Sequence, residues 1–285
     1  ESFEPAGAIE LIEKERCTVF YGMVNMARSI RENDGWSLEK LKSMRTGLTI
    51  GLPEDIQMII DTMSTSELCN VYGSTETYGN ASVCSSTDPI DLRLKSQGLP
   101  LPGMKIRVVD PETKVPLSPG EIGEITVAGY VTPGYFNAPE LTAQTFDKDG
   151  YFLTGDLGII GKDGRVYFKG RLKEIIKTGG VNVSPLEVEG VILKHPNVKQ
   201  AFVLGVPHKQ KTEAVTAVVE LNTISKTNPS EIITFCRNKL ASYKVPLSLF
   251  IRSNDELPRT STGKINKPAL RQEIIKELST TEFTS

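Results

Sequence analysis

The stretch Gly170-Arg-Leu-Lys-Glu-Ile-Ile-Lys-Thr-Gly-Gly-Val-Asn-Val-Ser-Pro-Leu-Glu-Val-Glu189 combines three local structural signals. Charged side chains surround the apolar pair 175–176, which is typical of a short strand. The pair Gly179-Gly180 lacks Cβ atoms, so it can adopt positive φ or let another molecule lie against the backbone. The run Ser184-Pro185-Leu186-Glu187 indicates a helix start with a serine N-cap, proline at the first helical position and a glutamate that completes a capping box. The stretch predicts a strand, a glycine turn and a helix, and taken alone it also fits an ordinary strand-to-helix loop.

Three further motifs occur along the chain, and they decide between these interpretations. They are Val71-Tyr-Gly-Ser-Thr-Glu76, Tyr151-Phe-Leu-Thr-Gly-Asp156 and Leu257-Pro-Arg-Thr-Ser-Thr-Gly-Lys-Ile265. Together with residues 170–189 they resemble the motif series of the adenylate-forming enzymes, which include acyl-CoA synthetases, aryl-CoA ligases, beetle luciferases and peptide-synthetase adenylation domains. All four occur in the family's order across almost the whole chain, which is far more specific than any single motif. The chain most resembles an acyl- or aryl-CoA synthetase.

Composition narrows the class of protein. The 285 residues are enough for about two domains, and 39% hydrophobic with 24% charged residues is typical of a globular protein. A net charge of −2 gives no electrostatic footprint for nucleic acid. No apolar run is long enough to predict a transmembrane segment. The four scattered cysteines form no C-x-x-C pair, which favours a reducing compartment and a cytoplasmic location.

The Gly/Ser/Thr-rich phosphate loop of the family is not found in this sequence. The resemblance covers roughly the second half of such an enzyme. We therefore expect a C-terminal portion whose upstream half supplies the phosphate loop and most of the acyl pocket, and which cannot adenylate without that half.

The hydrophobic pattern predicts a mixed α/β fold. Helices expected over 4–14, 24–32, near 37–43 and from Pro53 alternate with apolar runs, which is typical of a layered α/β domain with a parallel sheet. Short β-prone runs follow and predict a small antiparallel β-barrel or sandwich. After a hinge, further runs predict a compact α+β domain. The expected domains are the end of a large α/β domain (1–97), its β-barrel subdomain (98–172) and a mobile C-terminal domain (173–285).

The first candidate site follows a strand that ends at Tyr72 and Gly73. Polar residues placed there would lie at the carboxyl edge of a sheet, where α/β proteins bind ligands. The resemblance implies that Thr75 contacts the α-phosphate, that Glu76 holds Mg²⁺ and that Tyr72 lies against adenine. Gly73 and Ser74 complete this nucleotide-binding segment, with Thr75 and Glu76 also counted as catalytic. Without the other motifs, a polar turn after a strand would be the better interpretation.

Two more positions are implicated in nucleotide binding. Asp156 matches the aspartate that accepts both ribose hydroxyls in the family, and Arg171 would add donors to the same sugar. Alone, Asp156 would be interpreted as a solvated turn carboxylate. Gly51-Leu-Pro53 matches a segment near the adenine, although Leu52 is larger than the residue expected there and the segment is shorter.

The remaining candidate residues belong to the C-terminal part. The resemblance implies that Lys264 contacts the carboxylate and the α-phosphate during adenylation. It makes Lys173 the hinge about which the smaller domain swings. It also places Lys177, Gly179 and Gly180 against the pantetheine arm of CoA.

These motifs predict an ATP-dependent acid–thiol ligase that forms an acyl-adenylate and then a CoA thioester. Its substrates would be a carboxylic acid, ATP and CoA, with Mg²⁺ as cofactor. Peptide-synthetase domains typically carry Asp in place of Lys173, which favours a CoA ligase. Two alternatives stay open: a luciferase-like adenylating oxygenase, and a non-catalytic fragment that only binds nucleotide.

Overall fold

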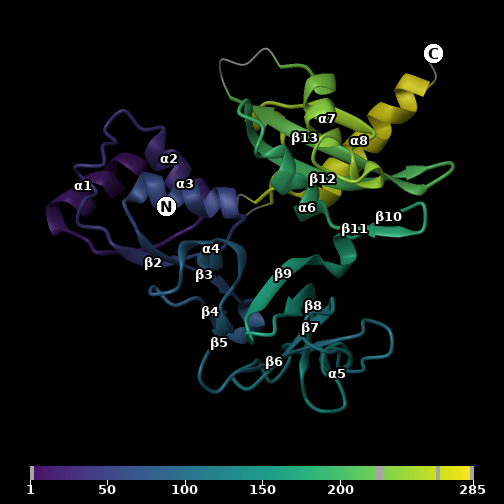
Figure 1. Cartoon of the computed structure of the whole chain (residues 1–285), viewed down its shortest axis with the longest axis horizontal. Helices are drawn as coiled ribbons and strands as arrows, with labels where there is room; N and C mark the ends of the chain where they lie inside the picture. Colours follow the sequence, from purple (N-terminus) through teal and green to yellow (C-terminus); the bar gives the residue numbers. More distant parts are fainter. Residues whose placement is uncertain (1–2, 223–226, 261–263, 283–285) are drawn as a thin grey trace. The chain divides into compact units, whose positions relative to one another are not determined.

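The computed structural model describes residues 3–222, 227–260 and 264–282. The chain divides into two compact units, Glu1–Lys169 and Gly170–Ser285, and each is described by itself (Figure 1). No helix in the described ranges is long and apolar enough to cross a membrane. The mixed α/β class predicted from the sequence is confirmed.

The first unit contains a five-stranded sheet with the order β1-β2-β3-β4-β5. Its strands are β1 (Val19–Tyr21), β2 (Thr46–Thr49), β3 (Glu67–Tyr72), β4 (Ser82–Val83) and β5 (Leu99–Pro100). Its helices are α1 (Pro5–Glu15), α2 (Val24–Arg31), α3 (Pro53–Met63) and α4 (Ile90–Lys95). Strands β1 to β3 are parallel, as the alternation of helices and apolar runs predicts, whereas β4 and β5 join antiparallel. Ile30, Ile59 and Leu68 belong to the core beneath the helices.

The helix expected near 37–43 does not form. Residues 38–43 are turns in which Leu41 N donates to Leu38 O and Met44 N to Leu41 O. These bonds span three residues, so the segment lacks the four-residue ladder of an α-helix. Leu41 and Met44 are buried, and these two side chains anchor the turns in place of a helical face.

A second sheet completes the first unit. Its strands β6 (Lys105–Val109), β7 (Gly123–Ala128), β8 (Phe152–Ile160) and β9 (Val166–Arg171) lie in sequence order, and α5 spans Pro139–Gln144. The pairs β6·β7 and β7·β8 are antiparallel, as predicted. The predicted barrel is wrong, because β6 and β9 remain the two edges of an open sheet within the described residues. Barrel closure requires the edge strands to pair, which these four short strands do not do.

The second unit is built on the hairpin of β12 (Val198–His208) and β13 (Thr212–Leu221). The sheet order is β11-β10-β13-β12, and β14 also pairs with β13. The other elements are β10 (Ile176–Thr178), β11 (Val181–Val183), α6 (Pro185–Ile192), α7 (Pro229–Arg237), β14 (Ser248–Ile251) and α8 (Lys267–Glu282). Short 3-10 helices are η1 (Thr75–Thr77), η2 (Leu172–Glu174), η3 (Ser242–Lys244) and η4 (Asn254–Glu256).

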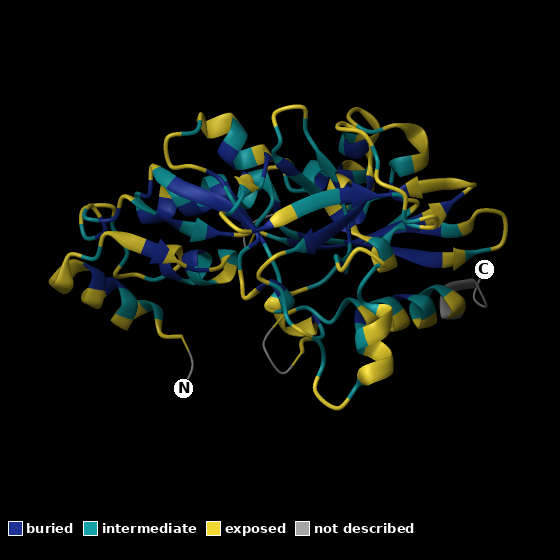
Figure 2. Ribbon diagram, turned by 90° about the horizontal axis from the view of Figure 1, so that it is seen from below, coloured by how far each residue is buried: buried dark blue, intermediate teal, exposed yellow. Residues whose placement is uncertain are grey.

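Both faces of this sheet are covered, which explains the nearly continuous apolar run of β13 (Figure 2). Val215, Ala217 and Val219 point to one face and share a core with α6 and α7. Ala214 and Val218 point to the other face and share a core with α8. The alternation follows the two-residue period of a strand.

The helices α6 and α7 differ in how their first residues are capped. Both α6 and α7 begin at the predicted prolines. Asn228 caps α7, because its Oδ1 accepts from Glu231 N at 3.1 Å. The capping box predicted for α6 is wrong: Ser184 makes no side-chain cap hydrogen bond, and Glu187 forms an ion pair with Lys244 instead.

An ion pair in the first unit joins the segment before α4 to Arg165, the residue directly before β9. Arg165 Nη1 and Nη2 donate to the two oxygens of Asp88 at 2.8 and 2.7 Å, and both side chains are largely buried. The hydrogen bonds from Arg165 hold the pKa of Asp88 below its usual range. Two parallel bonds of this kind are strong because both partners are charged.

We expect Arg165→Met to lower the free energy of unfolding by about 2 kcal/mol at pH 7. A carboxyl whose pKa is lower in the folded state stabilises it above the ordinary Asp pKa of about 3.9, and this contribution is lost as the pH falls through the lowered folded pKa. The deficit of the variant should therefore shrink at pH 3. Urea unfolding at both pH values measures it, with Arg45→Met as a control because the Arg45–Glu67 pair is largely exposed. An equal deficit at both pH values would contradict this account.

Candidate active site

The turn after β3 carries the first candidate residues. Gly73 is required there, because a Cβ at this position would lie 2.0 Å from the carbonyl oxygen of Gly79. Ser74 N donates to Thr77 Oγ1 at 2.9 Å, which fixes the start of η1. Thr75 is exposed and Glu76 half-buried. The turn therefore presents a hydroxyl and a carboxylate at the end of a parallel strand.

Glu76 is held by residues that sequence reasoning missed. Tyr135 Oη donates to Glu76 Oε1 at 2.9 Å, and Thr132 N donates to Glu76 O at 2.7 Å. Burial and the Glu76 carboxylate raise the pKa of the Tyr135 hydroxyl, which therefore stays a donor at neutral pH. No local signal marks Tyr135 as a partner of Glu76, since 59 residues separate them.

Glu76 offers one oxygen ligand of the kind that Mg²⁺ binds. The described part of the chain contains no group of three His, Cys, Asp or Glu side chains that could hold a metal ion. Mg²⁺ is usually bound by one or two carboxylates together with waters and substrate phosphates. A single half-buried carboxylate fits that pattern and does not fit a closed metal cage.

The structure brings together two motifs that lie far apart in the sequence. Tyr72 Oη donates to Asp156 Oδ2 at 2.9 Å, and Asp156 is only 3% exposed. The Tyr72 ring is buried and lies 6.1 Å from the Phe168 ring. Tyr72 thus orients the Asp156 carboxylate while its ring packs in the core of the unit.

The segment expected near the adenine begins a helix. Pro53 starts α3, and Leu52 is the residue before it. A Cβ on Gly51 would touch the side chains of Asp55 and Val24, so this position is closely packed. The contact between this segment and adenine remains a prediction.

In the second unit, most candidate side chains are exposed. Arg171 lies at the end of β9, and Lys173 lies in η2. Gly179 and Gly180 form the turn between β10 and β11 with φ of +57° and +81°, values that favour glycine. The space around this turn is open, since a Cβ on either glycine would meet no atom within 4 Å. Lys177, on the strand before this turn, is exposed as well.

Lys264 is exposed and lies in a segment that pairs with residues 258–260. Thr260 N donates to Lys264 O at 2.7 Å, and Asn266 N donates to Pro258 O at 2.8 Å. Residues 261–263 of the predicted motif, Gly263 among them, lie outside the described residues. The backbone of Lys264 is thereby fixed while its side chain faces solvent.

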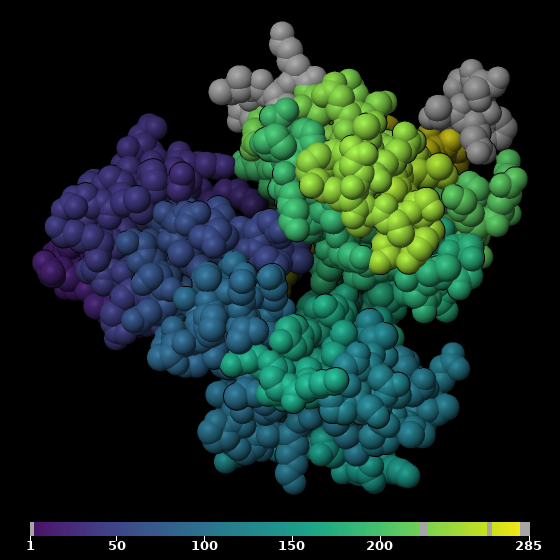
Figure 3. Space-filling model, viewed as in Figure 1, coloured from purple at the N-terminus to yellow at the C-terminus, as the bar shows by residue number. Residues whose placement is uncertain are grey.

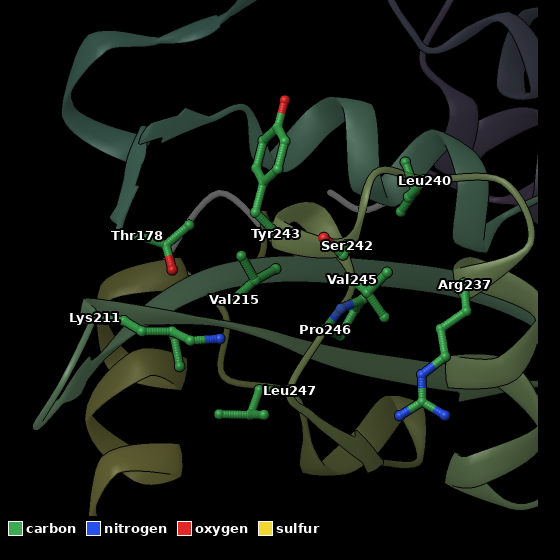
Figure 4. Close-up of a pocket in the computed structure, with 11 residues that line it drawn as sticks. Thr178, Lys211, Val215, Arg237, Leu240, Ser242, Tyr243, Val245, Pro246 and Leu247 are labelled. Carbon is green, nitrogen blue, oxygen red and sulfur yellow. The ribbon is translucent and has the colours of Figure 1, made fainter. Parts of the chain in front are cut away.

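A pocket of about 320 Å³ lies beside the glycine turn in the second unit. Gly179 N donates to Lys211 O at 2.9 Å, so the β10–β11 and β12–β13 turns lie side by side, and both project at the surface (Figures 1 and 3). Lys211 and Arg237 line opposite ends of the pocket in Figure 4, with Thr178 on the Lys211 side and Tyr243 between the two ends. The pocket therefore offers two cationic groups and an aromatic ring.

Comparison with known proteins identifies the family. The family model of AMP-binding enzymes matches residues 1–136, and that of the AMP-binding enzyme C-terminal domain matches 187–264. The mitochondrial medium-chain acyl-CoA ligase of Mus musculus is 32% identical over 281 residues, which are 97% of this chain and 45% of that protein.

Solved structures agree with these matches. ATP-bound MatB from Rhodopseudomonas palustris superposes with a TM-score of 0.86 at 32% identity, over 96% of this chain and 54% of the other. The o-succinylbenzoate CoA synthetase of Bacillus subtilis, in complex with its acyl-adenylate intermediate, gives 0.80 at 28% identity, over 94% and 54%. The chain spans about half the length of the relatives it matches. It belongs to the AMP-binding enzymes, the adenylate-forming family.

Proposed function

We propose that this chain is part of an ATP-dependent acid–thiol ligase, an AMP-forming acyl- or aryl-CoA synthetase that works together with an upstream half. The observation that carries the proposal is the hydrogen bond from Tyr72 to Asp156, which joins two nucleotide motifs 84 residues apart. The names of the relatives, which are acid–CoA ligases, support the same reaction class. The free cysteines support a reducing compartment, for which we propose the cytoplasm.

In the first half-reaction, a carboxylate oxygen of the acid attacks the α-phosphorus of ATP, and the bond to pyrophosphate breaks. We assign the ribose to Asp156 with Arg171 and the α-phosphate to Thr75. Glu76 would hold Mg²⁺, which would neutralise charge on the phosphates. Tyr135 keeps the Glu76 carboxylate oriented through its hydrogen bond. Tyr72, Gly73 and Ser74 complete the nucleotide-binding segment.

In the second half-reaction, the CoA thiolate attacks the acyl carbon, and the bond to AMP breaks. We assign the pantetheine arm to Lys177 and the open turn at Gly179-Gly180, where no Cβ obstructs an approaching chain. Lys264 serves the first half-reaction, and Lys173 is the pivot that exchanges the two roles. A pivot is expected to be a residue at the end of an element that absorbs a φ/ψ change, and Lys173 lies in the short η2.

Two assays on the complete enzyme test this function. Exchange of labelled pyrophosphate into ATP with a panel of carboxylic acids reports adenylation, and loss of free thiol reports thioester formation. AMP binding without any exchange would favour a fragment that only binds nucleotide. Light emission with an aryl-thiazoline acid would favour an oxygenase.

The pocket lined by Lys211 and Arg237 makes CoA binding testable. Its cationic groups suit the phosphates of CoA, and Tyr243 offers a face for stacking. We expect Lys211→Ala and Arg237→Ala each to raise KM for CoA about tenfold, with KM for ATP unchanged. Lys209→Ala is the matched control, because this exposed lysine on the same turn does not line the pocket. An unchanged KM for CoA in both pocket variants would remove this pocket from the CoA site.

A further inference from the structure

We propose that Glu124 is a positioning residue that fixes Asp156 for the ribose of the nucleotide. The inference rests on the proposed role of Asp156 as the ribose ligand. Glu124 does not itself contact substrate in this account. It acts by holding residues 154–156 of β8, which include Asp156.

Residues 154–156 of β8 lie where the ladder between β7 and β8 is interrupted. Glu124 pairs with Leu157, whereas Thr126 pairs with Leu153. The segment of β8 between these pairs therefore contains more residues than the segment of β7 opposite it. Residues 154–156 therefore form a bulge. A bulge redirects side chains and takes backbone groups out of the regular ladder, and bulges are enriched next to active sites.

Two side chains replace the interrupted ladder contacts. Glu124 Oε1 accepts from Gly155 N at 3.0 Å. Thr154 Oγ1 donates to Ile125 O at 2.6 Å and accepts from Asp156 N at 3.1 Å. Gly155 has φ of +69°, a conformation that glycine adopts without strain. Hydrogen bonds to β7 thus hold Thr154 and Gly155. A further hydrogen bond from Asp156 N to Thr154 holds Asp156.

The burial of Glu124 shows that its carboxylate is committed to this contact. Glu124 is only 3% exposed, and its second oxygen accepts from Lys114 Nζ at 2.7 Å. A buried carboxylate persists when its oxygens are paired, and a charged acceptor makes a stronger hydrogen bond to a backbone N–H than a neutral one. Lys114 balances the charge from the solvent side, and Gly155 donates to the inward oxygen.

The same contacts could serve the stability of the sheet alone, and the two roles differ in one observable. A carboxylate that only stabilises β7 and β8 would affect the binding of every nucleotide to the same degree. A carboxylate that positions Asp156 affects the recognition of the ribose hydroxyls. The ratio of affinities for AMP and 2′,3′-dideoxy-AMP separates these roles, because the dideoxy nucleotide lacks both hydroxyls.

The experiment measures this ratio by calorimetry on the complete enzyme. We expect Glu124→Ala to reduce the preference for AMP about tenfold, through loss of charge-assisted hydrogen bonds at a misplaced Asp156. Glu124→Gln should keep the preference, since an amide oxygen can still accept from Gly155 N. Thr154→Val removes the other support and should lower the preference as well. Glu121→Ala, an exposed glutamate on the approach to β7, is the matched control and should leave the ratio unchanged.

Asp156→Ala separates failure of this inference from failure of the proposed function. If Asp156→Ala leaves the ratio unchanged, the ribose assignment itself is wrong. If Asp156→Ala abolishes the preference while Glu124→Ala and Thr154→Val preserve it, the positioning role of Glu124 is overturned. Should Glu124→Ala fail to fold, the pair Glu124→Gln and Thr154→Val still decides: a preference retained in Thr154→Val, or lost in Glu124→Gln, contradicts the proposed contacts.

Discussion

Lys264→Ala is expected to slow adenylation by about 10²–10³-fold, by analogy with the loss of one oxyanion donor. Thioester formation from a supplied acyl-adenylate should keep its wild-type rate. The reason is that negative charge builds on the α-phosphoryl group as the carboxylate attacks and pyrophosphate leaves. A compact ammonium group placed there stabilises that charge, and the second half-reaction no longer requires it.

The structure supports this use of Lys264. Two backbone hydrogen bonds, from Thr260 N to Lys264 O and from Asn266 N to Pro258 O, hold the main chain around Lys264. The Lys264 residue is exposed to solvent. An exposed side chain on a hydrogen-bonded backbone is compatible with the role proposed for Lys264.

Separate assays of the two half-reactions measure the effect. Pyrophosphate exchange follows adenylation, and release of AMP from a supplied acyl-adenylate with CoA follows thioester formation. Lys162→Ala is a matched control, because it is the other lysine that follows a glycine directly and it is exposed on a turn. Equal losses in both half-reactions of Lys264→Ala would rule out separate roles for the two steps.

Local sequence signals predicted the elements that follow simple periodicity. Proline at 53, 185 and 229 marked the starts of three helices, because proline fits the first turn, where no backbone donor is needed. The nearly continuous apolar run of β13 could not by itself tell which residues face α8, since both faces of that strand are covered. The helix expected near 37–43 was wrong for a related reason. The apolar spacing there fits one helical turn, but Leu41 and Met44 are buried by a series of turns without a helix.

The candidate site shows a sharper limit. Tyr72 and Asp156 were found separately, each from its own motif, but no rule of spacing connects residues that meet only after two sheets have formed. The same holds for Glu76 with Tyr135, and for Glu124 with Gly155. Motifs therefore named the candidate residues, and tertiary pairing determined which side chains contact them.

The second large effect is on stability, and it concerns an ion-pair cluster in the second unit. Lys267, at the start of α8, lies 3.0 Å from a Glu174 oxygen and 3.1 Å from Glu189 Oε1. The same Glu189 oxygen accepts from Val203 N at 2.8 Å. One cation thus connects η2, α6 and α8, and through Glu189 it is tied to β12.

We expect Lys267→Met to lower the free energy of unfolding by about 3–5 kcal/mol at pH 7, because it leaves the buried Glu189 carboxylate uncompensated. Lys239→Met, an exposed lysine of the same unit, should change it by less than about 0.5 kcal/mol. Urea unfolding monitored by a probe in the second unit measures both. If Lys267→Met lowers the free energy of unfolding by less than about 0.5 kcal/mol, the cluster does not stabilise the unit.

The pH dependence identifies the group responsible. Burial raises the pKa of Glu189 in the folded chain, even with Lys267 beside it. A carboxyl with a raised folded pKa contributes stability that is fully present below its unfolded pKa of about 4.3 and is lost as the pH rises through the folded value. Removing the cation raises that pKa further, so the deficit of Lys267→Met should be small near pH 4 and grow toward pH 8.

A second substitution then tests whether the uncompensated charge is the cause. Glu189→Gln keeps an oxygen that can accept from Val203 N but carries no charge. Combined with Lys267→Met, it should restore most of the lost stability and remove the growth of the deficit with pH. If the double variant is as unstable as Lys267→Met, the loss comes from packing of the lysine side chain, and the ion pair with Glu189 is not its source. If stability returns, the uncompensated Glu189 carboxylate is the source of the loss, and the half-buried Lys267 stabilises the second unit by neutralising that charge.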